Sequence, residues 1–255
     1  MGEAGAQRAP GPRVRILGVG MGPQHVTPEV SAALREADYV LAAAKSEDDR
    51  LLDVRRRIAA EHGVPVVVVP DPPRDRADPA DYRRAVGDWH QARVAAYEAV
   101  LAERGGTAAM LIWGDPSLYD SSVRLVSAIA DRGAVPVEWD VLPGISAPQL
   151  LAARHRLVLN AVGGPVHVTT GRRLQDAVDA GLDDLVVMLN RTLGLGGLED
   201  WRIWWGANLG GVGEELVAGR VGDVLPAIRE ARERARATAG WVMDLYLLRR
   251  PAGTA

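Results

Sequence analysis

Four short stretches of this chain place glycine and polar residues directly after apolar runs. They are GVGMGP (Gly18–Pro23), WGDPSLYDSS (Trp113–Ser122), PGISA (Pro143–Ala147) and GANLGG (Gly206–Gly211). Glycine lets the backbone approach a ligand closely, and N–H groups at a helix start favour an anion. The second stretch adds a carboxylate, a phenol and hydroxyls that can bind polar groups or transfer protons. Together they predict a ligand held mainly by backbone and small side chains.

Several other chemistries find no support in the composition. The chain has no cysteine, which excludes disulfides, thiolate nucleophiles and thiolate metal sites. Its five histidines lack the spacing of metal ligands, so no metal is expected. A net charge of −3 argues against a broad nucleic-acid or membrane surface. No run approaches the roughly 18 apolar residues of a membrane span. The lack of cysteine suits a reducing cytosol, so we expect a cytoplasmic protein.

The apolar runs predict the elements that position these stretches. In the first half, continuous apolar strands alternate with helical patterns, which indicates an α/β fold with a largely parallel sheet. The strands expected there are Val14–Gly20, Asp38–Ala43, Val64–Pro70, Ala108–Trp113 and Val135–Gly144. Thr27, Pro28 and Glu29 have the residue types of a helix start. Val141–Ala153 is predicted to form a strand end followed by a loop.

The second half has strands that follow one another more closely, which predicts a mixed sheet with antiparallel pairs. The strands expected there are Pro165–Thr170, Asp183–Asn190, Trp201–Leu209 and Trp241–Arg250, with helices at Arg173–Ala180 and Gly222–Thr238. We therefore expect a disordered tail at 1–12, an N-terminal α/β domain at 13–136 and a C-terminal α/β domain at 137–255. The proline-rich segment Pro70–Tyr82 is long enough to be a lid or a spacer.

The GVGMGP turn has a competing interpretation as a dinucleotide site. That fingerprint places a third glycine where this chain has Pro23. It also places an acidic residue at the end of the second strand, whereas Asp38 begins that strand and lies at the opposite edge of the sheet. A nicotinamide or flavin enzyme is therefore disfavoured. A plain glycine turn without a ligand stays open for this motif alone.

The motifs, taken in order, resemble those of the tetrapyrrole methylase superfamily. Its pattern is a GxGPG…LT opening, a GDP-x-x-Y loop, a PGI-[ST]-[AS] turn and a YM strand end. This chain has GVGMGPQHVT, GDPSLYDSS, PGISA and Met188 in the same order, over about Arg13–Arg250. One departure is Met21, which stands where the superfamily usually has proline.

The resemblance implies a two-domain tetrapyrrole methylase fold. It has a parallel-rich N-terminal sheet, a mixed C-terminal sheet and an active site in the cleft between them, usually in a homodimer. It also implies S-adenosylmethionine as methyl donor, S-adenosylhomocysteine as product and no metal. The implied cofactor contacts are Met21, Trp113, Gly114, Asp115, Leu118, Ser146, Ala147, Met188, Ala207, Asn208 and Leu209. Met188 has the alternative role of filling the core.

Further likeness at Pro70–Arg93 and Leu159–Arg173 indicates a branch that serves aerobic cobalamin synthesis. That branch implies methylation of a corrinoid precursor at C-1, with loss of an acetyl group as acetate. The second step needs a water and a base. Tyr119, Asp120 and His167 are candidates, among which the sequence does not choose. Asp120 has the alternative role of capping the helix near Ser121, and His167 that of a structural residue.

A corrinoid substrate carries many carboxylates, so an acidic protein must gather cations locally. Thr170, Arg172 and Arg173 are the predicted substrate contacts, with a solvated helix start as the alternative. Lys45, the chain's single lysine, is predicted to line the substrate trough, with an ordinary exposed lysine as the alternative. Other functions considered are a different methylase of the superfamily and a catalytically silent corrinoid-binding protein.

Overall fold

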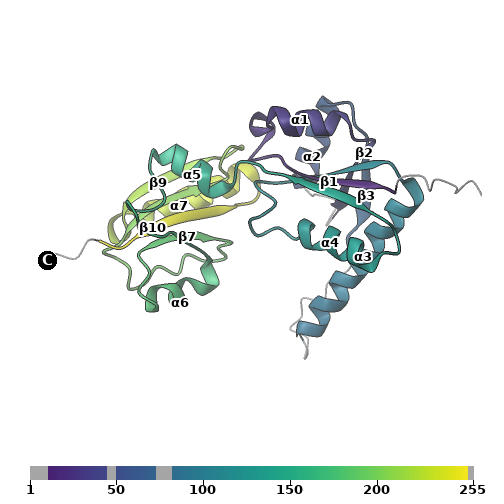
Figure 1. Ribbon diagram of the computed structural model, residues 1–255. Helices are drawn as coiled ribbons and strands as arrows, with labels where there is room; N and C mark the ends of the chain where they lie inside the picture. The colour runs from purple at the N-terminus through teal and green to yellow at the C-terminus, as the bar shows by residue number, and fades with distance from the viewer. Residues whose placement is uncertain (1–10, 45–49, 73–81, 252–255) are drawn as a thin grey trace, which may run out of the picture. The chain divides into compact units, whose positions relative to one another are not determined.

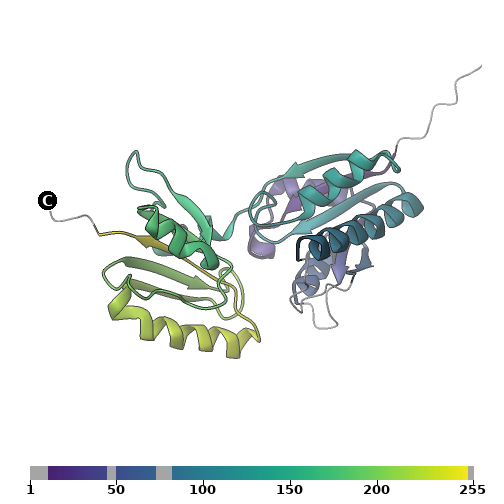
Figure 2. The ribbon, with the colours of Figure 1, turned by 90° about the horizontal axis from the view of Figure 1, so that it is seen from below.

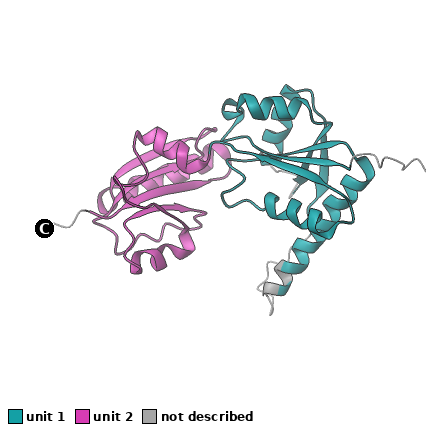
Figure 3. Cartoon of the chain, in the orientation of Figure 1, with its two compact units in different colours: residues 1–145 teal, residues 146–255 magenta. Residues whose placement is uncertain are grey.

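The computed structural model describes residues 11–44, 50–72 and 82–251. The chain divides into two compact units, residues 1–145 and 146–255 (Figure 3). Each unit contains its own five-stranded sheet.

Unit 1 is built on a parallel sheet with the strand order β3-β2-β4-β1-β5 (Figure 1). Its strands are β1 (Arg13–Gly18), β2 (Tyr39–Ala44), β3 (Val66–Pro70), β4 (Thr107–Ile112) and β5 (Glu138–Leu142). Its helices are α1 (Pro28–Arg35), α2 (Arg50–Glu61), α3 (Tyr82–Arg104) and α4 (Ser122–Arg132), with a 3₁₀ turn η1 (Pro23–His25). The expected alternation of strands and helices in the first half is confirmed.

Helices cover both faces of this sheet. Alternate residues of each strand point to opposite sides, so both faces carry apolar side chains that a helix must cover. Ile16 and Met110 pack in one apolar cluster with α3 and α4. Leu17 and Leu111, their chain neighbours, pack in another with α1 and α2. The Thr27 hydroxyl accepts a hydrogen bond from Val30 N at 3.2 Å, so the predicted start of α1 is confirmed.

Unit 2 is built on a mixed sheet with the order β6-β7-β10-β8-β9, in which only β6 and β7 are parallel. Its strands are β6 (His167–Thr170), β7 (Asp184–Met188), β8 (Arg202–Ala207), β9 (Glu215–Arg220) and β10 (Asp244–Arg249). Its helices are α5 (Ala147–His155), α6 (Leu174–Asp179) and α7 (Val221–Ala239), with a 3₁₀ turn η2 (Gly171–Arg173). Figure 2 shows α7 along one face of the sheet, where it packs in the core cluster.

The structure differs from the expectations in three places. The units divide at 145/146, not at 136/137, because β5 pairs with β1 and so completes the first sheet. The loop expected through Ala153 contains helix α5, which begins after Ser146. Strand β9 was not expected, and it pairs with β8 at the edge of the second sheet.

Among the described residues, none of the helices has the length and apolar composition needed to cross a membrane. Residues 1–10 of the predicted tail lie outside the described residues. The same holds for residues 73–81 of the predicted lid.

Candidate functional site

The carboxyl ends of β1, β4 and β5 meet closely at one edge of the unit 1 sheet. A Cβ on Gly18 would lie 2.4 Å from Gly144 N, and a Cβ on Gly144 would lie 2.3 Å from Gly114 O. Side chains are excluded at these two positions, because the opposing atoms are backbone that cannot move aside. The glycines of the GVG, WGD and LPG stretches therefore bring three strand ends into backbone contact.

Asp115 joins two of these strand ends. Its Oδ2 accepts a hydrogen bond from Gly144 N at 2.9 Å, and its Oδ1 accepts one from Ser117 N at 2.8 Å and another from the Ser117 hydroxyl. Burial by itself raises the pKa of Asp115, but the bonds from Ser117 and Gly144 outweigh it and hold the pKa below its ordinary value. Asp115 is therefore an ionised carboxylate at neutral pH, fixed by donors from its own unit.

The first turn is tied to the same place. Gly20 and Gly114 exchange backbone hydrogen bonds at 3.2 and 2.8 Å, and both have positive φ. Met21, which follows, is 4% exposed. The indole Nε1 of Trp113 is buried and has no hydrogen-bond partner within the described part of the chain. A buried indole N–H normally finds an acceptor, so Trp113 is suited to a ligand with a polar group.

The rest of the GDPSLYDSS loop leads into α4. Leu118 is half-buried, and Tyr119 is 45% exposed with a φ of 55°. Asp120 Oδ1 accepts a hydrogen bond from Ser122 N at 2.6 Å, which is the capping role considered as its alternative. The loop thus presents Tyr119 to solvent and directs Asp120 toward the start of α4.

In unit 2, Ser146 and Ala147 begin a helix. Ser146 is 8% exposed, and its N–H donates to Gln149 Oε1 at 2.8 Å in a capping box. Pro148 occupies the first turn, where its missing N–H costs nothing. The spacing Ser146-x-x-Gln149 is a helix-start signal, and it would have identified α5 from the sequence.

The loop after β7 is held by a buried charged group. Asp244 begins β10 and is 6% exposed; its Oδ2 accepts from Arg232 Nε at 2.9 Å and Trp205 Nε1 at 3.2 Å. Arg232 also donates to the carbonyls of Asn190 and Arg191. Met188, just before this loop, is half-buried. These contacts fix the path of the chain after the predicted cofactor contact at Met188.

The Asp244 carboxyl is strongly desolvated. Burial raises its pKa above the ordinary value, and Arg232 and Trp205 only partly offset that effect. Neither Arg232 nor Asp244 was predicted from the sequence. Asp244 did carry a signal, because a carboxylate within the apolar run WVMDLYLLRR must find a partner when that strand is buried.

The GANLGG stretch ends β8 on the same edge as Asp244, because Ala207 pairs with Asp244. Ala207 and Leu209 are 0% and 1% exposed. Asn208 has a φ of 49°, and its side chain accepts from Met243 N at 2.9 Å and donates to Trp241 O at 3.2 Å. The side chain of Asn208 is therefore occupied by unit 2 itself.

The predicted substrate contacts of unit 2 lie at the end of β6. Thr170 is half-buried, while Arg172 and Arg173 are exposed. Arg173 Nε pairs with Asp176 at 3.1 Å. His167, at the start of β6, is also exposed. The end of β6 thus carries two exposed arginines, and their contact with a substrate stays a prediction.

Lys45 lies outside the described residues. In the described ranges, no group of three or more His, Asp and Glu residues could hold a metal ion.

The comparisons with known proteins agree with this geometry. A family model, Tetrapyrrole (Corrin/Porphyrin) Methylases, matches residues 13–225. The chain belongs to this methylase family. A precorrin-6A synthase [deacetylating] from Sinorhizobium sp. is 40% identical in an alignment that covers 99% of this chain and 98% of that protein.

Solved structures of the tetrapyrrole methylase fold are similar as well. The crystal structure of a cobalamin synthesis related protein (CobF) from Corynebacterium diphtheriae is 32% identical with a TM-score of 0.78, over 93% of this chain and 98% of that one. A uroporphyrin-III C-methyltransferase from Thermus thermophilus, crystallised with S-adenosylhomocysteine, is 20% identical with a TM-score of 0.56, over 93% and 97%. The predicted fold is confirmed.

Proposed function

We propose that this chain is a precorrin-6A synthase (deacetylating), which methylates precorrin-5 at C-1 and releases acetate. The observation that carries the proposal is the 40% identity to a protein of that name, over nearly the full length of both chains. Membership of the tetrapyrrole methylase family supplies the reaction class. The protein is proposed to act in the cytoplasm of the cell as a homodimer.

S-adenosylmethionine supplies an electrophilic methyl group on a sulfonium. The residues proposed to bind it in unit 1 are Met21, Trp113, Gly114, Asp115 and Leu118. The Trp113 N–H, which has no partner among the described residues, fits an acceptor on the methionine end of such a ligand. The ionised Asp115 carboxylate favours a cationic ligand over an anionic one.

The contacts proposed from unit 2 are Ser146, Ala147, Met188, Ala207, Asn208 and Leu209. The half-buried side chains of Ala147 and Met188 offer apolar surface to an adenine and a thioether. Because Asn208 bonds within its own unit, it is proposed to shape the turn, with any direct contact made by its neighbours.

The protein's part in methyl transfer is positioning. Holding the donor carbon and the ring carbon at near-attack distance, with water excluded, removes much of the barrier of a bimolecular displacement. Strand ends fixed by Asp115 in unit 1 and by Asp244 in unit 2 provide rigid supports for this. No protein nucleophile is needed, which agrees with strand ends made of glycines and small side chains.

Loss of the acetyl group requires a water and a base, for which Tyr119, Asp120 and His167 are the candidates. The carboxylate of Asp120 already accepts from Ser122 N, which weakens its claim to be a base. Tyr119 and His167 are exposed, and neither is hydrogen-bonded through its side chain to another described residue. These two are therefore the first candidates to replace.

Substrate carboxylates are proposed to bind Thr170, Arg172 and Arg173, and also Lys45. The two arginines form a natural comparison, because Arg173 is paired with Asp176 while Arg172 is in no ion pair with a described residue. Arg172→Ala should raise the KM for the corrinoid and leave kcat nearly unchanged, as expected for uniform binding. Arg173→Ala should raise it less. Equal and unchanged KM values would remove both residues from the substrate site.

The decisive experiment incubates the purified protein with precorrin-5 and S-adenosylmethionine. The expected result is a product that has gained one methyl group and lost one acetyl group, together with one equivalent each of acetate and S-adenosylhomocysteine. Methylation of another corrinoid in preference to precorrin-5 would support the alternative, a different methylase of the family. Binding of NADH without binding of S-adenosylhomocysteine would contradict both.

A further inference from the structure

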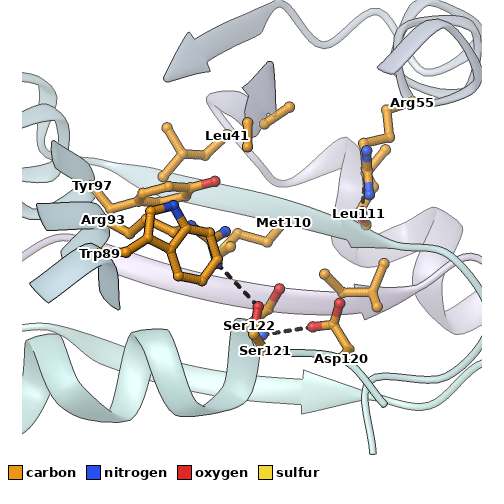
Figure 4. Close-up of a pocket in the computed structure, with 13 residues that line it drawn as sticks. Leu41, Arg55, Trp89, Arg93, Tyr97, Met110, Leu111, Asp120, Ser121 and Ser122 are labelled. Carbon is orange, nitrogen blue, oxygen red and sulfur yellow. Dashed lines mark hydrogen bonds between the residues drawn. The ribbon is translucent and has the colours of Figure 1, made fainter. Parts of the chain in front are cut away.

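Unit 1 contains a pocket of about 130 Å³ that none of the predicted contacts except Asp120 lines. It lies at the ends of β2 and β4, under α3 and beside the start of α4 (Figure 4). Figure 4 shows Trp89, Arg93 and Tyr97 grouped at one side, and Arg55 and Asp120 at the other. A water occupies about 30 Å³ in the liquid, so the pocket suits a ligand of about four heavy atoms. An adenine or a whole tetrapyrrole is too large.

Arg93 is the group that gives this pocket its chemistry. It is 7% exposed, and its Nη1 donates to the Ser121 hydroxyl at 3.1 Å. Its Nε lies 3.0 Å from Asp71 Oδ1, yet neither atom has a hydrogen-bond partner among the described residues. A buried charge is costly unless it is both paired and hydrogen-bonded. Arg93 is thus held by Asp71 at Nε and by Ser121 at Nη1, and the Nη1–Nη2 edge of its guanidinium can bind an anion beside Ser121.

Neighbouring groups add to that capacity. The Arg93 guanidinium lies 4.9 Å from the centre of the Trp89 ring, which fixes its plane. Burial raises the pKa of Tyr97, which Arg93 offsets only in part, so the phenol stays protonated and can donate. The carboxylate of Asp120, the acidic residue of the lining, is turned to Ser122 N. Leu41 and Met110 provide apolar walls.

We propose that this pocket binds a short-chain carboxylic acid, with its carboxylate on Arg93 and Ser121 and its carbon atoms against the apolar walls. Its size and mixed lining fit a two- or three-carbon acid. Two sources of this chemistry exist if the proposed function holds: the acetate that the reaction releases, and an acetate or propionate side chain of the tetrapyrrole. Only this choice of source rests on the proposed function.

The first test measures binding of acetate to the full-length protein without other ligands, by saturation-transfer NMR with chloride at equal ionic strength as reference. Arg93→Lys keeps the charge and loses the fork, and Ser121→Val fills the pocket and removes the hydroxyl. Both should lower the acetate signal at least fivefold. Ser127→Ala removes a hydroxyl that makes an exposed contact with Asp131 on α4, and it should leave the acetate signal unchanged. No acetate signal in wild type, or an equal signal in wild type and Ser121→Val, overturns the proposal.

A second measurement distinguishes the sources by turnover with precorrin-5. If the pocket holds released acetate, added acetate inhibits without raising the KM for the corrinoid, and Ser121→Val removes the inhibition. If it holds a substrate side chain, acetate competes with the corrinoid, and Ser121→Val raises the KM. Acetate binding without any methylation would contradict the proposed function and leave the pocket standing. Methylation with no acetate binding would support the proposed function and overturn the proposal for the pocket.

Discussion

Asp115 and Asp244 stand at the predicted ligand edges of the two sheets and are held in opposite ways. Asp115 accepts hydrogen bonds from Gly144 and Ser117, and they lower its pKa although burial opposes them. Asp244 has Arg232 at 2.9 Å, yet burial raises its pKa. The fold therefore favours the ionised form of the first carboxylate and disfavours that of the second.

The difference follows from how each edge is built. Asp115 is bonded to Ser117, two residues away, within a turn that the motif itself specifies. Asp244 joins Trp205 and Asn190, which are 39 and 54 residues away, and also Arg232 on α7. Unit 1 thus forms its edge from turns and glycines that bring the backbones of three strands together, whereas unit 2 stabilises its edge with a buried network of side chains.

Removing Asp244 should have the largest effect on stability. Asp244→Ala leaves Arg232 without its buried partner and Trp205 Nε1 without an acceptor. Breaking a buried pair in this way costs about 3–5 kcal/mol. Urea unfolding measures the change. Asp183→Ala, which removes an exposed pair with Arg250, is the control and should cost under about 1 kcal/mol. Equal losses would mean that the buried network does not support unit 2.

In unit 1 the corresponding change is Gly144→Ala. The new Cβ would lie 2.3 Å from Gly114 O and 2.7 Å from Gly18 C, so three strand ends must separate. Overpacking of this kind costs about 1–3 kcal/mol, and we expect the upper end because the opposing atoms are backbone. Affinity for S-adenosylhomocysteine should fall as well.

Gly87→Ala provides the control for that variant. Gly87 lies within α3, and no described atom outside the backbone of that helix and its two chain neighbours lies within 4 Å of an added Cβ, so alanine should stabilise by up to about 1 kcal/mol. Thermal melting and calorimetry on both variants give the two readouts. A Gly144→Ala variant that melts normally and keeps its affinity would show that the close approach of the strand ends is not required.

The sequence allowed the parallel sheet to be predicted, because its apolar strands are continuous and three of them, β1, β4 and β5, end in a glycine turn. It also allowed the edge with Gly18, Asp115 and Gly144 to be predicted as a candidate site. Strand β9 was missed, because the polar-flanked run Glu215–Arg220 acquires its strand conformation by pairing with β8. Arg232 was missed because an arginine in a charged helix gives no sign of the buried carboxylate it meets.

The two carboxylates should also give opposite pH profiles of stability. The pKa of Asp115 is lowered in the fold, so its contribution is present above the unfolded pKa of about 3.9 and is lost as pH falls through the folded pKa. The pKa of Asp244 is raised, so the pH-dependent part of its contribution is full below the unfolded pKa and is lost as pH rises through the folded pKa.

Chemical unfolding of wild type, Asp115→Asn and Asp244→Asn between about pH 3 and 7 tests this difference. Relative to wild type, the loss of unfolding free energy caused by Asp115→Asn should be smallest at low pH. The loss caused by Asp244→Asn should be smallest at neutral pH. Two parallel profiles would show that the carboxylates are held alike.

The smallest effect concerns Ser146, which has two proposed roles. It forms a capping box with Gln149, and it is a predicted contact of S-adenosylmethionine. Ser146→Ala and Gln149→Ala should each cost about 1 kcal/mol of stability, because both weaken the start of α5. They should differ in ligand affinity. A lost hydrogen bond of about 0.5–1.5 kcal/mol predicts S-adenosylhomocysteine binding roughly twofold to thirteenfold weaker in Ser146→Ala alone. Calorimetry that finds the same affinity in both variants would leave Ser146 as a helix cap and nothing more.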